Sequence, residues 1–337
     1  MAPRKIGDHS PMSWQTVVDQ GLELTVVGSF TRIGYAVRRR LFDWQQPSPS
    51  ALEGRTALVT GPTSGLGRAA TDELAALGAR VILVSRSAER MGEVRDALVA
   101  RHGVDRFPAV VADMGSLHSV ETAVARILDT ERRLDVVVDN AGAIFPERTI
   151  GPDGIEATLA TLVIGPFALV AGLLPLLSEA GGGRVVAVTS GGMYTQALDL
   201  DDLQLNAAPY SGTRAYARAK RAQVALVREW ARRLPASGLA FNAMHPGWAD
   251  TPGLADQLPG FYRLMKPILR TPDEGVDTLV WLAAATQAQT LSGGLFLDRR
   301  PRPFDRVPAT RLSAHDRRRL WARVVELADV PDPAPDG

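Results

Sequence analysis

Cysteine is absent from the 337-residue chain. This absence excludes a disulfide scaffold, thiolate catalysis and zinc or iron–sulfur sites with cysteine ligands. It also fits a reducing compartment, and we expect a cytoplasmic protein. Any catalysis must therefore use other side chains.

Lysine is scarce, and net charge is nearly absent. The 38 basic and 37 acidic residues leave a charge of +1, and only Lys5, Lys220 and Lys266 are lysines. A near-neutral chain has no overall electrostatic attraction for nucleic acid, so we expect no such partner. A lysine inside a recognisable motif is unlikely to occur there by chance.

Membrane-targeting and metal-binding patterns are also missing. Met1 to Met12 show no basic start followed by an apolar core, as a secretory signal requires. No run approaches the roughly 18 to 20 uninterrupted apolar residues of a membrane span, so the sequence predicts a soluble protein. The five histidines lack metal-ligand spacing, so we expect no metal, and His245 before Pro246 is interpreted as structural.

The chain divides into an N-terminal helical extension with a linker (1–50), a catalytic domain (51–300) and a C-terminal extension with a short helix (301–337). Residues 14–44 indicate one or two helices, followed by a Pro/Ser-rich linker. Two alternatives stay open for this extension. It packs against the main domain, or it is a helix for peripheral membrane or partner contact.

From Arg55 onward, short β-branched runs alternate with longer helical stretches. This alternation predicts an α/β fold with a single Rossmann-type, doubly wound parallel sheet and helices on both faces. We expect about seven strands, at 56–60, 80–85, 107–111, 134–138, 184–190, 239–244 and 294–297, with helices at 67–77, 88–101, 117–130, 154–179, 215–233 and 314–327. Gly165-Pro166 and Pro175 predict kinks in the helix at 154–179. Ligands of such sheets bind beyond the carboxyl ends of the strands.

The first expected strand leads directly into a glycine-rich turn and a helix. Such a turn lets backbone amides approach a pyrophosphate, whose charge the helix N-terminus favours. The spacing is Gly-x-x-x-Gly-x-Gly, which differs from Gly-x-Gly-x-x-Gly. The predicted cofactor-binding residues here are Thr60, Gly61, Ser64, Gly65, Leu66 and Gly67.

The following strand ends supply further candidates for cofactor binding. Arg86 stands where a carboxylate would select NAD, so we expect it to contact the 2′-phosphate of NADP. Asp113, beside Met114, could reach the adenine or cap the next helix. Asn140, Ala141 and Gly142 are small enough to let the backbone pass close to a cofactor.

Tyr216 and Lys220 are four residues apart at the start of an expected helix, and Ser190 ends the fifth strand. Residues with this helical spacing share one face, so both side chains can point into the same cleft. A free tyrosine titrates near 10, and a neighbouring ammonium lowers its pKa by favouring the phenolate. The pair is therefore a candidate for acid/base catalysis.

Together these motifs, with Pro246, Gly247 and Thr251, resemble the classical short-chain dehydrogenase/reductases from about Gly54 to Leu297. The flanks, including Gly34 to Arg40, resemble the retinol-dehydrogenase-like branch, in particular its dehydrogenase/reductase member-twelve type. The resemblance implies that Tyr216 donates a proton to a carbonyl, that Lys220 binds the nicotinamide ribose and lowers the Tyr216 pKa, and that Ser190 orients the substrate. It also implies that Thr251 contacts the nicotinamide amide, and that self-association can use the helices at 154–179 and 215–233, for example in a homodimer.

Two positions depart from the family pattern. Asp139 replaces the first Asn of Asn-Asn-Ala-Gly, and Leu162 occupies the place of the helix Asn that completes a catalytic tetrad. A leucine cannot support a water-mediated proton relay to Lys220. The relay then runs differently, or turnover is slow.

The sequence therefore predicts an NADP(H)-dependent oxidoreductase, with NAD(H) less favoured, that acts on a lipophilic ketone, aldehyde or alcohol. The rival hypothesis is a cofactor-binding protein with little turnover that serves in redox sensing or interaction. We expect the substrate pocket at Gly191 to Gly212 and Trp248 to Arg270. Its predicted apolar residues are Met193, Tyr194, Leu198, Trp248, Leu254, Leu258, Phe261 and Tyr262.

Overall fold

A computed structural model describes residues 13–207 and 209–335. The expectation about a secretory leader falls on Met1 to Met12 and lies outside the described residues. The described chain contains a sheet of eight strands in the order β3-β2-β1-β4-β5-β6-β7-β8. The strands are β1 (Thr56–Thr60), β2 (Arg80–Ser85), β3 (Ala109–Val111), β4 (Val136–Asp139), β5 (Arg184–Val188), β6 (Ala240–Met244), β7 (Leu295–Leu297) and β8 (Arg300–Pro301).

The pairings from β3 to β7 are parallel, and only β8 runs antiparallel to its neighbour. The predicted fold class is confirmed. The count exceeds the expectation by one because Asp298 and Arg299, both at positive φ, form a tight turn that folds β8 back onto β7.

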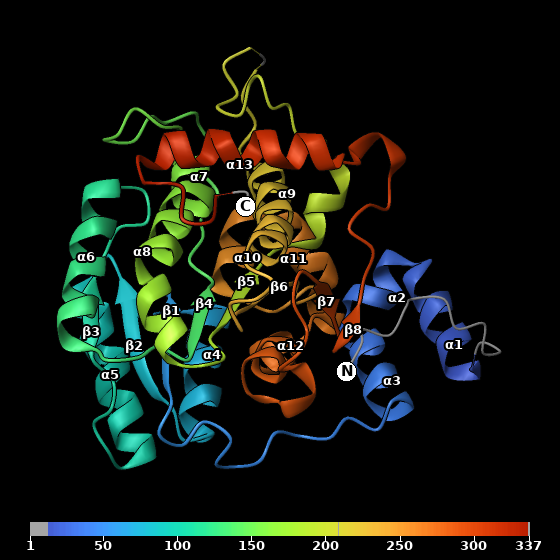
Figure 1. Ribbon diagram of the computed structural model, residues 1–337. Helices are drawn as coiled ribbons and strands as arrows, with labels where there is room; N and C mark the ends of the chain where they lie inside the picture. The colour runs from blue at the N-terminus through green and yellow to red at the C-terminus, as the bar shows by residue number, and fades with distance from the viewer. Residues whose placement is uncertain (1–12, 208, 336–337) are drawn as a thin grey trace.

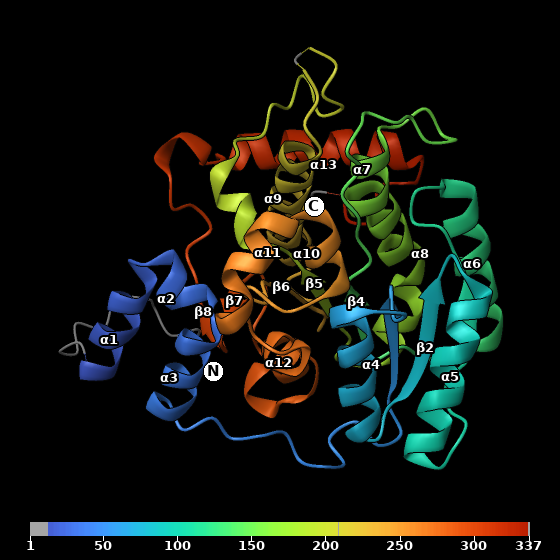
Figure 2. The same cartoon turned by 180° about the vertical axis from the view of Figure 1, so that it is seen from behind.

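Helices cover both faces of the sheet (Figures 1 and 2). One face carries α4 (Gly65–Ala76), α5 (Ala88–His102) and α12 (Pro272–Ala284), and the other carries α6 (Leu117–Thr130), α8 (Gly165–Glu179) and α9 (Gly212–Arg233). Successive strand residues point to opposite faces, so Leu58 packs in one core and Val59 in the other. This double burial explains why the strands are continuous apolar runs.

The predicted helix at 154–179 consists of α7 (Ala157–Leu159), a π-helical segment (Ala160–Ile164) and α8. The irregular turn ends just before Pro166, which has no N–H to donate to a helical bond, whereas Pro175 lies inside α8. Contrary to the expectation from sequence, Ala157–Glu179 is long and apolar enough to cross a membrane. In the fold, however, 72% of its most apolar window is buried, as in a core helix.

Within residues 13–50 of the N-terminal extension, the structure has three helices rather than one or two: α1 (Trp14–Glu23), α2 (Val26–Phe30) and α3 (Arg32–Leu41). The acidic side of α1 faces the protein, where Asp19 pairs with Arg38 and Arg302. Its opposite side carries exposed apolar residues, with Trp14 and Val17 at 68% and 53% exposure. Membrane or partner contact through this segment stays a prediction.

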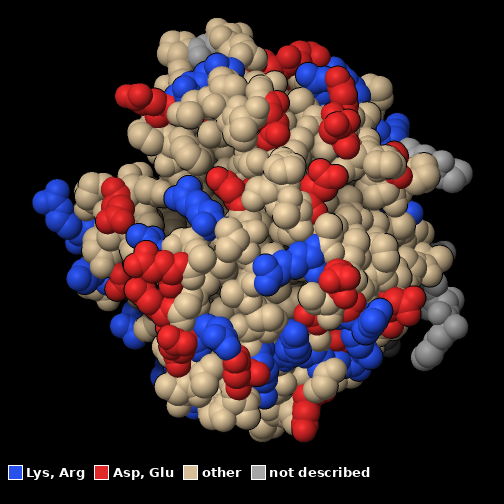
Figure 3. Space-filling model, turned by 90° about the vertical axis from the view of Figure 1, so that its left-hand side faces the viewer, with Lys and Arg blue, Asp and Glu red and all other residues tan. Residues whose placement is uncertain are grey.

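The C-terminal helix α13 (Ala314–Ala328) lies across α8 and α9 (Figure 1). Trp321 of α13 is buried and packs edge-on against Phe167 of α8 and Trp230 of α9. This contact covers part of the helix faces named for self-association, so a homodimer through them stays a prediction. The face on which α5 and α6 lie carries interspersed acidic and basic side chains (Figure 3).

The remaining helices are short and lie near the carboxyl ends of the strands or in the connections after them. They are α10 (Pro252–Gln257), α11 (Pro259–Met265) and the 3-10 turns Gly191–Thr195, Lys266–Ile268, Thr286–Ala288 and Pro308–Thr310.

Candidate active site

A cavity of about 1000 Å³ opens at the carboxyl edge of the sheet, beside the first turn of α4. It brings together every predicted site residue except Thr60. The predicted residues that line it are Gly61, Ser64, Gly65, Leu66, Gly67, Arg86, Asp113, Met114, Asn140, Ala141, Gly142, Ser190, Tyr216, Lys220, Pro246, Gly247 and Thr251.

The turn between β1 and α4 needs its glycines. Gly61 and Gly65 have φ values of +67° and +51°, in the left-handed region that favours glycine. A Cβ at Gly67 would collide with the Gly61 carbonyl and with the Asn140 side chain. Ser64, the residue before α4, makes no side-chain capping bond, so the first amides of α4 lie beside the cavity with the donors that an anion requires.

Thr60 is buried beneath this turn, and its hydroxyl is fully engaged there. Its Oγ1 accepts the backbone N–H groups of Asn140 and Ala141, both at 2.9 Å, and donates to the Val138 carbonyl. Asn140 in turn donates from Nδ2 to the Thr60 carbonyl at 2.9 Å. Thr60 therefore fixes the loop after β4 against β1 and does not line the cavity.

Arg86 lies exposed at the cavity wall, and none of the hydrogen bonds or ion pairs between described residues involves its guanidinium. A second basic residue, Arg90, lines the same wall and was not predicted. The Asp113 carboxylate accepts the Gly115 N–H at 2.9 Å, while Ser116 caps α6. Asp113 thus shapes a turn at the cavity and is not the helix cap.

Tyr216 and Lys220 both face the cavity from α9, as their spacing predicts. Burial raises the pKa of the Tyr216 hydroxyl above its ordinary value of 10.0, and a hydrogen bond with the Ser190 side chain opposes that rise. The Tyr216 pKa is therefore raised, and not lowered as expected from the neighbouring Lys220. The Lys220 Nζ lies 5.8 Å from the centre of the Tyr216 ring.

Lys220 belongs to a buried chain of polar groups. Its Nζ donates to the Val188 carbonyl at 2.7 Å and to Gln223 Oε1 at 3.1 Å. Gln223 Nε2 donates to Asp139 Oδ2 at 2.6 Å, while Asp139 Oδ1 has no hydrogen-bond partner among the described residues. Gln223 therefore connects the carboxylate to the ammonium through one amide.

Burial shifts the pKa values of both ends of this chain. It lowers the pKa of Lys220 to about 8, and the Asp139 charge opposes that change. It raises the pKa of Asp139 to about 6, and Lys220 and Gln223 oppose that change. The first departure from the family pattern thus places a titratable carboxyl group behind the lysine.

Leu162, the second departure, is fully buried in the π-helical segment and does not line the cavity. A Cβ at Gly142 would lie 3.0 Å from its Cδ2 and 4.0 Å from the Lys220 Nζ. The apolar Leu162 side chain and the Lys220 ammonium therefore both approach Gly142. Thr161, the preceding residue, does reach the cavity.

The substrate side of the cavity is partly as predicted. Trp248, Leu254, Leu258 and Phe261 line it. Met193, Tyr194, Leu198 and Tyr262 do not. The 3-10 turn at Gly191–Thr195 directs Met193 and Tyr194 into the core, Leu198 packs against that core, and the Tyr262 hydroxyl donates to Asp250.

Ile144 and Phe145 complete the apolar wall and were missed. In the sequence, only their position just after Asn-Ala-Gly could have indicated that they line the cavity. His245 is buried, its Nδ1 accepts the Gly247 N–H, and burial holds its pKa well below 6.5. These contacts agree with the structural interpretation.

The site combines a glycine turn at a helix N-terminus with a serine, a tyrosine and a lysine at the carboxyl edge of a parallel sheet. This combination defines a class of nucleotide-dependent oxidoreductases. The sequence model of the short chain dehydrogenase family matches residues 55–259. The chain belongs to the short-chain dehydrogenase/reductase family of oxidoreductases.

Individual relatives narrow the comparison. Dehydrogenase/reductase SDR family member 12 of Bos taurus is 36% identical over 290 residues, which covers 85% of this chain and 89% of that protein. "Putative daunorubicin C-13 ketoreductase DnrU" of Streptomyces sp. (strain C5) is 40% identical over 253 residues, covering 75% and 86%. A solved short chain dehydrogenase of Shigella flexneri complexed with NADP has 25% identity and a TM-score of 0.62, covering 75% of this chain and 100% of that one.

Proposed function

We propose that this protein transfers a hydride between NADP(H) and a lipophilic ketone or aldehyde, or the corresponding alcohol, with Tyr216 as the general acid or base. The observation that carries the proposal is the meeting of Tyr216, Ser190 and Lys220 at one cavity edge, beside the glycine turn.

The residues present fit a dinucleotide phosphate. The glycine turn and the first amides of α4 would hold the pyrophosphate, and the exposed Arg86 would hold the 2′-phosphate. When bound, the nicotinamide supplies or accepts the hydride. The Shigella flexneri relative with NADP supports this choice of cofactor.

The side chains of this chain would handle the proton. Tyr216 would donate its hydroxyl proton to the carbonyl oxygen, and Ser190, whose side chain interacts with the Tyr216 hydroxyl, would orient that oxygen. The Lys220 ammonium would favour the phenolate that remains. Gln223 accepts a hydrogen bond from this ammonium and donates one to Asp139.

The lipophilic substrate is inferred from the cavity wall. Trp248, Leu254, Phe261, Ile144 and Phe145 offer apolar surface close to the polar Ser190 and Tyr216. Such a pocket binds an apolar body and orients one polar group. The name of the Streptomyces relative refers to a ketone, which agrees with this class.

Tyr216→Phe tests the proposal directly. The substitution keeps the aromatic ring and its packing but removes the hydroxyl proton. The rate of NADPH oxidation with a panel of ketones and aldehydes should therefore fall by about a hundredfold to ten-thousandfold. NADPH affinity should stay close to wild type. Tyr210→Phe is the matched control, since the Tyr210 hydroxyl bonds to Thr158 and Glu156 outside the cavity. Full activity of Tyr216→Phe would show that the proton donor is another group.

Leu162 favours a second candidate, a cofactor-binding protein with little turnover that acts in sensing or interaction. Its buried apolar side chain offers no hydrogen bond for a water beside Lys220. Tight NADPH binding by the wild type with no oxidation on any ketone or aldehyde of the panel would favour this candidate over the enzyme.

A further inference from the structure

Phe30 connects the N-terminal extension to the active site. It ends α2, is 4% exposed, and lies outside residues 55–259 that match the family. Its ring packs edge-on against Trp248, with centroids 5.9 Å apart, and against His245 at 4.6 Å. Trp248 lines the substrate side of the cavity, so Phe30 supports that wall from behind.

The same ring touches the loop that carries the catalytic serine. A Cβ at Gly191, the residue after Ser190, would lie less than 3.0 Å from the Phe30 ring, a separation that real Cβ atoms essentially never show. Gly191 and Phe30 therefore fit each other, and Phe30 limits where the Ser190 loop can lie.

The backbone of Phe30 joins the second loop of the site. Its carbonyl accepts the Trp248 N–H at 2.8 Å and the Arg270 Nε–H at 3.0 Å. Gly247, at a φ of +72°, has room for no side chain, because a Cβ there would collide with the Phe30 carbonyl and with Arg270. Both loops that border the substrate are thus built around this one residue.

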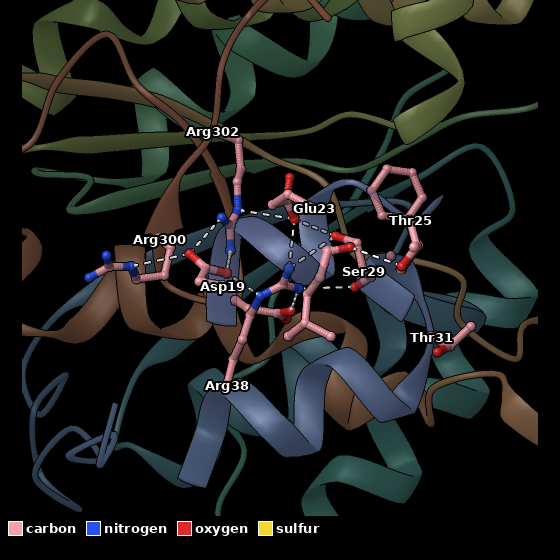
Figure 4. Close-up of polar contacts among 12 residues, drawn as sticks. Asp19, Glu23, Thr25, Ser29, Thr31, Arg38, Arg300 and Arg302 are labelled. Carbon is pink, nitrogen blue, oxygen red and sulfur yellow. Dashed lines mark hydrogen bonds and ion pairs between the residues drawn. The ribbon is translucent and has the colours of Figure 1, made fainter. Parts of the chain in front are cut away.

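A buried ion network fixes Phe30 in place. Arg270 donates to Asp298 Oδ1 at 2.6 Å, and Arg38 donates to Asp298 Oδ2 at 2.7 Å. Both arginines also donate to the Ser29 carbonyl at 3.0 Å, just before Phe30. Figure 4 shows Arg38 between Asp19 and Glu23 of α1 and beside Ser29, with Arg302 reaching Asp19 from the C-terminal segment.

We propose that Phe30 is a positioning residue of the active site, which sets the separation between the Ser190–Gly192 loop and the Pro246–Trp248 loop and so shapes the substrate side of the cavity. The inference rests on the proposed function, because it assigns a role to the extension at that same site. The alignment with the Bos taurus relative spans 290 residues, more than the family core, so similarity to it extends into the flanking segments.

A double-mutant cycle tests the proposal. Gly191→Ala pushes a methyl group into the Phe30 ring and displaces Ser190, so kcat/KM for the carbonyl should fall by about tenfold or more. Phe30→Leu removes the two ring atoms nearest to Gly191 and loosens Trp248. We expect a drop of about threefold to tenfold, with NADPH affinity unchanged.

In the double variant the new methyl group occupies the space that the ring leaves. Its kcat/KM should therefore equal or exceed that of Phe30→Leu alone, a coupling of about tenfold between residues in contact. Gly192→Ala is the matched control, since a Cβ there meets Ser190 and Ala217 at 3.7 and 4.0 Å but not Phe30. The effects of Gly192→Ala and Phe30→Leu on kcat/KM should multiply, with no coupling between the two substitutions.

If the effects of Gly191→Ala and Phe30→Leu on kcat/KM simply multiply, as expected for the Gly192→Ala control, the positioning role of Phe30 is overturned. Wild-type turnover of the same carbonyl is measured in parallel. A missing coupling with intact wild-type turnover counts against Phe30 alone, whereas a wild type without turnover counts against the proposed function.

Discussion

Asp139→Asn tests how the lysine of the site keeps its charge. The substitution retains the size of the side chain and removes a buried charge, which restores the Asn of the family pattern. The Asp139 charge opposes the effect of burial on Lys220, whose pKa is about 8. Without that charge, the pKa of Lys220 should fall further, and the ammonium should be lost at lower pH.

The size of the shift follows from the geometry. One amide separates the two groups, with hydrogen bonds of 3.1 and 2.6 Å on its two sides. Unit charges roughly 6 Å apart interact by about 2.8 kcal/mol at an effective dielectric constant of about 20, or about two pKa units. We expect one to two units because other dipoles will rearrange, so the alkaline fall in kcat/KM should move down by about one to two pH units.

The assay is kcat/KM for a carbonyl from pH 5 to 9.5 with saturating NADPH. Below about pH 6 the wild-type Asp139 gains its own proton, so wild type and variant should converge there. Asp135→Asn is the matched control, because Asp135 pairs with Arg55 and Arg133 before β4 begins, away from the cavity. Identical alkaline limbs for Asp139→Asn and wild type would refute the electrostatic role of Asp139.

Three further outcomes are expected. Arg86→Asp should reduce the preference for NADPH over NADH by about tenfold to a hundredfold, since an ion pair becomes a repulsion; an unchanged ratio of the two kcat/KM values would remove Arg86 from the 2′-phosphate site. Leu162→Asn should raise turnover, because its amide gives a water molecule beside Lys220 a hydrogen-bond partner. If the buried amide finds no partner, the melting temperature should fall by an amount that corresponds to about 1 to 3 kcal/mol. Lower turnover in a well-folded Leu162→Asn variant would contradict the expected gain. Arg38→Met should destabilise the fold by about 3 to 5 kcal/mol in denaturant titrations, because it removes the buried arginine that pairs with Asp19, Glu23 and Asp298 at once. The exposed Arg39→Met is its control, and equal stabilities of the two variants would argue against the network.

Local patterns predicted most of the framework. The runs at 56–60 and 80–85 coincide with β1 and β2, because strands buried on both faces must be continuously apolar. The glycine turn and the Tyr216–Lys220 pair were predictable for a different reason, because their residues recur at a fixed spacing along the chain.

Contacts between distant segments could not be predicted in this way. Nothing near Phe30 indicates that it reaches Gly191, and Asp139 meets Gln223 only after β4 and α9 are packed together. Met193 and Tyr194 have the composition of a pocket, yet the 3-10 turn buries them in the core. An apolar side chain can enter either the core or an apolar pocket wall, and its residue type does not predict which.

The ion pairs of the N-terminal extension also constrain the order in which a nascent chain can mature. Arg38 and Asp298 are 260 residues apart in the sequence, and Asp19 and Arg302 are 283 apart. A ribosome delivers Asp19, Glu23 and Arg38, which pair with one another, long before it delivers Asp298 and Arg302. The ion pairs that join helices α1 and α3 to the main domain therefore form only after residues 298–302 have emerged. Until then the ion pair that holds Arg38 beside the Ser29 carbonyl is missing, so the position of Phe30 behind the substrate wall is settled among the last steps of folding.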